Sequence, residues 1–141
     1  MPALKTVDSA SPPHAPPPSD TWESRTARSV TRWGRCGAVV TVGGELDAAN
    51  AGQLADYVQQ CVRYCEWLVL DLDNLDFFGV AGFSALRTIA ERCAQTSVHC
   101  TTVPGAAVAR LLRICDPTQA LLTSSSLDEA LAGVQNLGRR P

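Results

Sequence analysis

The sequence predicts an α/β fold built on a mostly parallel β-sheet, because two kinds of segment alternate along it. Runs of apolar or β-branched residues, typical of strands, recur at 38–42, 67–72 and 97–103. Each run is followed by a segment with apolar residues at helical spacing, over residues 47–65, 79–93 and 104–115. This alternation indicates parallel strands joined by right-handed crossovers.

Further strands extend this pattern to the order β-β-α-β-α-β-α-β-α. Residues 30–33 are expected to form a short edge strand before the first long one. The uninterrupted apolar run at 67–72 suits a central strand covered on both faces. After a short link, the apolar residues 75–78 lead to Gly79, which opens the second helix. Residues 120–123 are expected to form a last short strand.

The C-terminal part carries a helix-start signal. Ser126 is followed three residues later by Glu129, which is the spacing of a capping box. Apolar residues then recur at helical spacing up to residue 134, so we expect a final helix there. Residues 137–141 are expected to form a polar C-terminal end.

The N-terminal part differs in composition from the rest. Residues 9–20 are rich in Pro, Ser and Ala and contain almost no large apolar side chains. Such a segment cannot bury enough apolar surface to offset the entropy lost on ordering. We therefore expect a disordered, Pro-rich tail over residues 1–28 and a single domain over residues 29–136, which fits the 141-residue length.

Composition and charge exclude several classes of function. The net charge of −2 offers no basic surface for nucleic acid or for an anionic membrane. No apolar run approaches the roughly 20 residues that span a bilayer, and no export signal is recognisable near Met1. We therefore expect a cytoplasmic protein whose six cysteines are reduced.

Three segments, in this order and spacing, resemble the STAS domain of anti-sigma factor antagonists. The first is Gly-Gly-Glu-Leu-Asp at 43–47, followed by two alanines. The second combines 68–72 with 75–86, which is similar to a hydrophobic-Asp-Leu run and a following Phe-x-Asp-Ser-x-Gly-Leu motif. The third is the closing helix around 125–131. The resemblance covers about residues 30–134.

The resemblance implies a sheet with helices on one face and a regulatory role without catalysis. Members of the family bind a kinase-like anti-sigma factor and thereby release a sigma factor. The contact surface is centred on the N-terminus of the helix that follows the central strand. Carried onto this sequence, the partner-binding residues are Gly79, Val80, Ala81, Gly82 and Phe83, together with Asp47 at the adjacent strand exit.

The sequence departs from the family pattern at the position that is normally phosphorylated. The family's Asp-Ser pair corresponds here to Gly79 and Val80. Valine has no hydroxyl, so the partner kinase cannot phosphorylate this position, and no phosphorylation site is expected there. Ser84 lies one turn into the same helix and is the substitute acceptor to consider, although its spacing from Gly82 differs from that of the family.

Other chemistry in the sequence leaves three alternatives to the antagonist hypothesis. A thiol switch would use Cys61, Cys65, Cys93 and Cys115, although free cysteines commonly pack as small apolar residues. A STAS scaffold would bind other STAS domains instead of an anti-sigma factor. A small-molecule or nucleotide-binding enzyme is the third alternative, although the sequence contains no P-loop, Gly-x-Gly-x-x-Gly motif or catalytic triad. No cysteine and histidine spacing fits zinc, so neither a metal nor a cofactor is expected.

Overall fold

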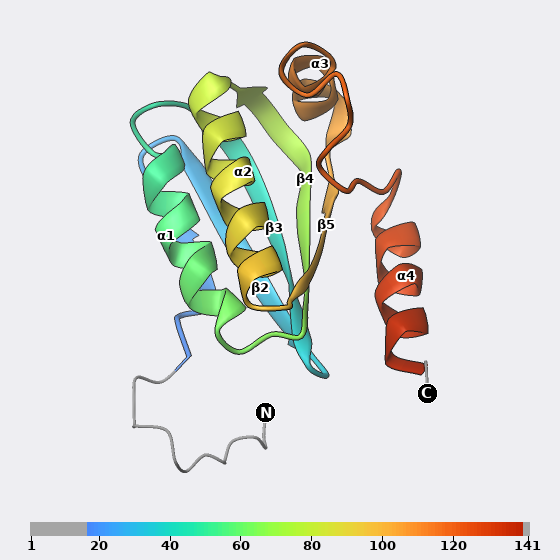
Figure 1. The fold of residues 1–141 in the computed structure, drawn as a ribbon. Coiled ribbons are helices and arrows are strands. Elements are labelled where there is room, and N and C mark those ends of the chain that lie inside the picture. The colour runs from blue at the N-terminus through green and yellow to red at the C-terminus, as the bar shows by residue number, and fades with distance from the viewer. Residues whose placement is uncertain (1–16, 140–141) are drawn as a thin grey trace.

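The computed structural model describes residues 17–139, with side chains up to Val134, and places them in one mixed sheet and four helices (Figure 1). The strands are β1 (Thr21–Glu23), β2 (Ala27–Gly34), β3 (Gly37–Leu46), β4 (Trp67–Phe78) and β5 (His99–Val103). The helices are α1 (Ala51–Val62), α2 (Val80–Gln95), α3 (Gly105–Cys115) and α4 (Leu127–Arg139). The predicted α/β class is confirmed.

The strands lie in the order β1-β2-β3-β4-β5. β3, β4 and β5 pair in parallel, as predicted from the alternation of strands and helices. β2 pairs antiparallel with both β1 and β3, because the connections on its two sides, of three and two residues, are too short for a crossover. The sequence had also predicted a short link between the apolar runs 67–72 and 75–78. That link does not form, because β4 runs without a break from residue 67 to 78.

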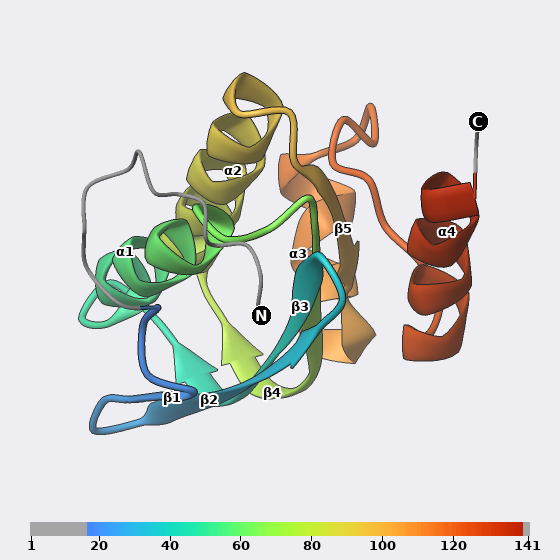
Figure 2. The ribbon, with the colours of Figure 1, turned by 90° about the horizontal axis from the view of Figure 1, so that it is seen from below.

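The helices divide between the two faces of the sheet (Figure 2). α1, α2 and α3 pack over Val40, Leu68 and Leu70 and enclose the main core. α4 packs on the opposite face, where its apolar residues contact Val39 and Val69. The family resemblance implied helices on one face, so α4 departs from that expectation. The reason lies in β3 and β4, which are apolar on both faces and need cover on both.

The folded part begins earlier than the boundary expected at residue 29. β1 and the start of β2 lie before that residue. Trp22 packs partly buried against the core, and the carbonyl of Ser19 accepts a 2.6 Å hydrogen bond from the hydroxyl of Tyr57. These contacts hold residues 19–28 against the domain, whereas residues 1–16 of the predicted tail lie outside the described residues.

The strand expected at 120–123 does not form. The only pairing there is an isolated parallel bridge between Thr102 and Thr123. The carboxylate of Asp116 explains the difference, because it accepts 3.0 Å hydrogen bonds from the backbone N–H groups of Ala120 and Leu121. Those N–H groups are thereby held in a turn and are not free to pair with β5.

The predicted cap of the last helix is confirmed. The hydroxyl of Ser126 accepts a 3.1 Å hydrogen bond from the N–H of Glu129. The Glu129 carboxylate in turn accepts bonds from the backbone and side chain of Ser125, and these bonds lower its pKa. α4 then continues to Arg139, so the expected polar end at 137–141 begins within the helix.

Candidate functional site

The predicted partner-binding residues lie where β3 and β4 end side by side. Leu46 pairs with Phe78 in the last register position of these two parallel strands. The N–H of Gly79 donates a 3.1 Å hydrogen bond to the carbonyl of Leu46. This bond brings Asp47, at the exit of β3, to the same edge of the sheet as the start of α2.

The start of α2 has no side-chain cap. Gly79 precedes the helix in an extended conformation, and its carbonyl accepts bonds from the N–H groups of Gly82 (2.9 Å) and Phe83 (3.2 Å). A glycine in this position offers no side-chain oxygen to the first N–H groups of the helix. The positive end of the helix dipole is therefore not neutralised by an acidic residue in the first turn.

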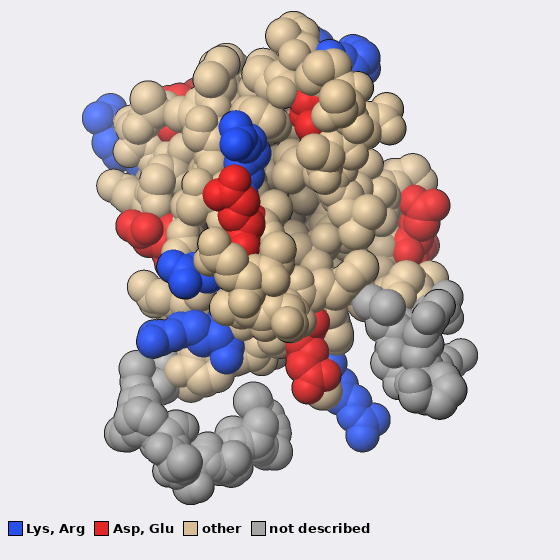
Figure 3. Space-filling view, viewed as in Figure 1, with Lys and Arg blue, Asp and Glu red and all other residues tan. Residues whose placement is uncertain are grey.

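Two apolar side chains stand exposed around this helix start. Val80, the first residue of α2, is 65% exposed, and Phe77, the penultimate residue of β4, is 50% exposed. Figure 3 shows uncharged atoms over the start of α2, with charged side chains further along the same face. Because these two side chains are exposed beside the same helix start, they form a small apolar patch, a feature of surfaces that contact another protein.

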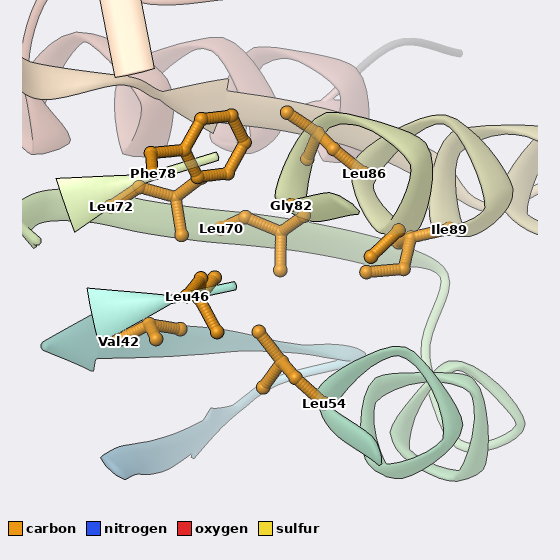
Figure 4. Close-up of a pocket in the computed structure, with 10 residues that line it drawn as sticks. Val42, Leu46, Leu54, Leu70, Leu72, Phe78, Gly82, Leu86 and Ile89 are labelled. Carbon is orange, nitrogen blue, oxygen red and sulfur yellow. The ribbon is translucent and has the colours of Figure 1, made fainter. Parts of the chain in front are cut away.

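Gly82 and Phe83 were also expected in the contact surface, but the structure buries both. A Cβ atom at Gly82 would lie only 2.7 Å from the ring of Phe78, so the helix packs closely on that ring (Figure 4). Phe83 is 9% exposed, and the guanidinium of Arg87 lies 5.9 Å from its ring centre. These two residues therefore support the helix start from beneath, and the exposed surface consists of Phe77 and Val80.

The core beneath the helix start is filled. The apolar side chains drawn in Figure 4, among them Leu46, Leu70 and Ile89, leave a cavity of about 10 Å³. A volume of that size is at the lower limit for a single water molecule and holds no organic ligand. At this end of α2, therefore, only the outer surface is available for contact with another molecule.

Comparison with known proteins agrees with this geometry. Residues 27–130 match the family model described as the STAS domain. The chain belongs to the STAS domain family. The anti-sigma-F factor antagonist RsfA of Mycobacterium tuberculosis is 32% identical over 98 residues, covering 67% of this chain and 77% of that protein. RsfB of the same organism is 27% identical, covering 70% and 81%.

Another relative matches over a shorter part of its length. The osmosensory protein A of Mycobacterium tuberculosis is 38% identical over 74 residues, which are 52% of this chain and 47% of that protein. The match therefore spans about half of that relative.

Solved structures show the same STAS fold. An anti-sigma factor antagonist from Mycobacterium paratuberculosis superposes with a TM-score of 0.71 at 24% identity, covering 78% of this chain and 95% of that one. The unphosphorylated anti-sigma factor antagonist SpoIIAA superposes with a TM-score of 0.63 at 12% identity, covering 77% and 96%. Within residues 17–139, none of the helices has the length and apolar character needed to cross a bilayer.

Asp47 is half-buried and shapes the entry to α1 of the STAS domain. Its carboxylate accepts a 2.9 Å hydrogen bond from the N–H of Ala49, and its carbonyl accepts one of 2.9 Å from the N–H of Ala51. The sequence had predicted that this helix begins at residue 47, but it begins at Ala51. Asp47 thus holds the loop beside Gly79 in place, and its side chain is only partly available to a partner.

Phe77 was missed in the sequence, although a signal for it exists. Side chains alternate between the two faces of a strand, so Phe78 inward places Phe77 outward. Phe78 itself is 6% exposed and lies in the core. Ser84, the substitute acceptor, is exposed one turn into α2, and its carbonyl accepts a 3.0 Å bond from the hydroxyl of Thr88.

The cysteines considered for a thiol switch are only partly brought together. Cys61, Cys65 and Cys93 lie where α1 and α2 end, and Cys65 interacts with both others. Cys115 ends α3, which lies at the other end of the sheet (Figure 1). Cys100, which the redox hypothesis had not included, joins the first group instead. Among the described residues, no three His, Cys, Asp or Glu side chains are placed to hold a metal ion.

Proposed function

We propose that this STAS domain is a cytoplasmic regulator that binds a kinase-like anti-sigma factor and so frees a sigma factor. The observation that carries the proposal is the exposure of Val80, at 65%, at the start of α2. That position corresponds to the phospho-acceptor of the family motif, and here it holds an apolar side chain. The relatives named anti-sigma-F factor antagonists support the same class of partner.

The contact is proposed to be apolar at its centre and polar at its rim. Phe77 and Val80 supply the apolar area, and Glu45, which pairs with Phe77 in the sheet, lies exposed beside it. An interface with a buried apolar centre and a polar rim is the common arrangement in protein complexes. The open end of the α2 dipole adds a preference for acidic or hydrogen-bond-accepting groups on the partner.

The proposed contact is not switched by phosphorylation at the helix start. The solved structures of SpoIIAA include a phosphorylated form and an unphosphorylated form. In this chain Val80 cannot accept a phosphate, so binding persists when the partner kinase is active. Incubation with the partner and ATP should leave the tryptic peptide 64–87 free of phosphate. Phosphate on Ser84 within that peptide would contradict this part of the proposal.

Replacement of Val80 by Glu tests the docking surface. We expect Val80→Glu to weaken partner binding by about 2 kcal/mol or more, because a carboxylate would have to be desolvated in an apolar contact. The variant should fold, since an exposed carboxylate at a helix N-terminus is favourable. The measurement is calorimetric titration with a candidate anti-sigma factor.

Thr88→Glu provides the matched control. Thr88 is exposed on the same helix two turns further along, so this variant adds the same charge to α2 away from the proposed contact. It should bind like the unmodified protein. Equal affinities of Val80→Glu and Thr88→Glu would count against the surface.

A second candidate function, scaffolding through other STAS domains, is favoured by the same exposed apolar pair. Phe77 and Val80 could pair with an equivalent surface on another STAS domain. Light scattering of the chain alone and with the anti-sigma factor separates the two candidates. A stable homo-oligomer that Val80→Glu dissociates, together with no binding of the anti-sigma factor, would favour the scaffold.

A further inference from the structure

Four of the six cysteines gather at the end of α2 that lies away from the docking surface. Cys61 and Cys93 are 0% and 1% exposed and belong to the main core. Cys65 and Cys100 are partly buried and pack against the same core. Cys61 lies at the end of α1, Cys65 in the connection from α1 to β4, Cys93 in the last turn of α2 and Cys100 at the start of β5. The topology thus collects thiols from segments up to 39 positions apart in the sequence.

Within this group, the side chains of Cys93 and Cys100 interact directly. The chain reverses direction between them, with Ser97 in the left-handed conformation at φ 61°. The N–H of Val98 donates a 2.8 Å hydrogen bond to the carbonyl of Cys93, which fixes the start of β5 against the last turn of α2. Both side chains point into the same core, and their thiols are hydrogen-bonded to each other.

We propose that Cys93 and Cys100 are a modification site that forms a reversible intramolecular disulfide when the protein meets hydrogen peroxide. The bond would join the last turn of α2 to β5. Nothing in the docking surface is required for this reaction, so the proposal is independent of the proposed function.

The reaction balances with one molecule of peroxide. The Cys93 thiolate attacks one peroxide oxygen and breaks the O–O bond, which gives a sulfenic acid and a hydroxide that is protonated to water. The Cys100 sulfur then attacks the Cys93 sulfur, so that the S–S bond forms and the S–O bond breaks. The departing hydroxide takes the Cys100 proton and leaves as a second water. Two electrons pass from the two sulfurs to the peroxide.

The electrostatics of the pair assign these roles. The hydrogen bond from Cys100 lowers the pKa of the Cys93 thiol, whereas the same contact raises that of Cys100. Because the thiolate is the nucleophile, Cys93 is the sulfur that is oxidised first, and Cys100 resolves it. Cys93 is buried, so the peroxide reaches it through local opening of the last turn of α2, where Gln95, Thr96 and Ser97 are exposed.

Cys65 is a poorer candidate for the sulfur that is oxidised first. Burial, with a smaller contribution from the nearby Cys61 and Cys93 thiols, raises the pKa of its thiol to about 12. Its Sγ also donates a 3.3 Å hydrogen bond to the carbonyl of Cys61, which turns the sulfur toward its own helix end. Cys65 therefore stays a protonated thiol under conditions in which Cys93 reacts.

Trypsin separates the rival outcomes, because cleavage after Arg92 and Arg110 leaves Cys93 and Cys100 in one peptide, 93–110. The full chain is treated with hydrogen peroxide, unfolded in the presence of N-ethylmaleimide, digested and analysed by mass spectrometry. We expect peptide 93–110 to lack maleimide and to be lighter by two hydrogens than the reduced peptide. Dithiothreitol should restore both thiols. This result needs no variant and therefore no assumption about folding.

Two variants sharpen the assignment. Cys100→Ala should abolish the internal bond and leave Cys93 as sulfenic acid, whereas Cys115→Ala, at the end of α3, should leave the bond intact. A cross-link between peptides 93–110 and 64–87 would assign the partner to Cys65 and overturn the proposal. Maleimide on both thiols of peptide 93–110, or sulfinic and sulfonic acids alone, would overturn it as well.

Discussion

The two ends of helix α2 differ in what surrounds them. At its start, Val80 is 65% exposed, the helix is uncapped and the neighbouring Phe77 points outward. In its last turn, Cys93 is 1% exposed and contacts other thiols in the core. One helix therefore carries an exposed surface at one end and a buried, oxidisable group at the other. Because its side chains are exposed, the start of α2 is available for contact with a partner. In the last turn, by contrast, core packing limits how Cys93 can be changed or reached.

The largest change in stability is expected at Gly82, where the start of α2 packs on the core. Gly82→Ala would place a Cβ atom 2.7 Å from the Phe78 ring, so the helix or the ring must shift. We expect the free energy of unfolding to fall by about 1–3 kcal/mol, as in overpacked cores. Urea denaturation measures it.

Gly133→Ala is the control for that variant. A Cβ atom at Gly133, in the middle of α4, would meet no atom within 4 Å. There the same substitution should stabilise the protein by about 0.5–1 kcal/mol through helix propensity. If both variants changed stability in the same direction, the close packing beneath the helix start would not be a constraint.

The next effect concerns the buried end. Cys93→Ala removes a core sulfur and should lower the free energy of unfolding by about 1–2 kcal/mol, because a small cavity replaces it. Partner affinity should be unchanged, since the docking surface lies at the other end of α2. Parallel denaturation and calorimetric titration check both statements. A loss of affinity in the folded variant would show that the two ends are coupled.

A smaller effect is expected in the pH dependence of stability. Burial raises the pKa of Cys65 from 9.0 to about 12, so the folded chain holds this proton more tightly than the unfolded chain. The stability from this group is present below pH 9.0 and is lost as the pH rises toward about 12. Cys65→Ala should flatten this part of the profile, measured by urea denaturation at a series of pH values. Replacement of the exposed Cys36 by Ala should leave the slope as it is.

The smallest effect on stability is expected at the exposed end. Val80→Ala removes a side chain that lies largely in water, so the free energy of unfolding should change by less than about 0.5 kcal/mol. Partner affinity should nevertheless fall by about 1–2 kcal/mol, as for an apolar residue at the centre of an interface. If Val80→Ala lost stability but kept its affinity for the partner, Val80 would serve the fold and not the contact, which would contradict the prediction.

Much of the site was predictable from local signals. The helix start at Val80 follows from a strand that ends in two phenylalanines and a glycine, and the cap at Ser126 follows from the spacing to Glu129. The burial of Gly82 was not predicted, because it depends on how closely α2 packs on Phe78. The pairing of Cys93 with Cys100 depends on the turn that folds β5 back along α2.

The sequence by itself determined the alternation of strands and helices, the parallel core of the sheet and the absence of a hydroxyl at position 80. These properties depend on residue type and on periods of two or 3.6 residues, which are local. Only the tertiary structure decided that α4 covers the second face, that Phe77 is exposed and that four cysteines pack at the same end of the core. Those properties arise from contacts between segments distant in the chain, whose positions are set by the packing of the whole domain.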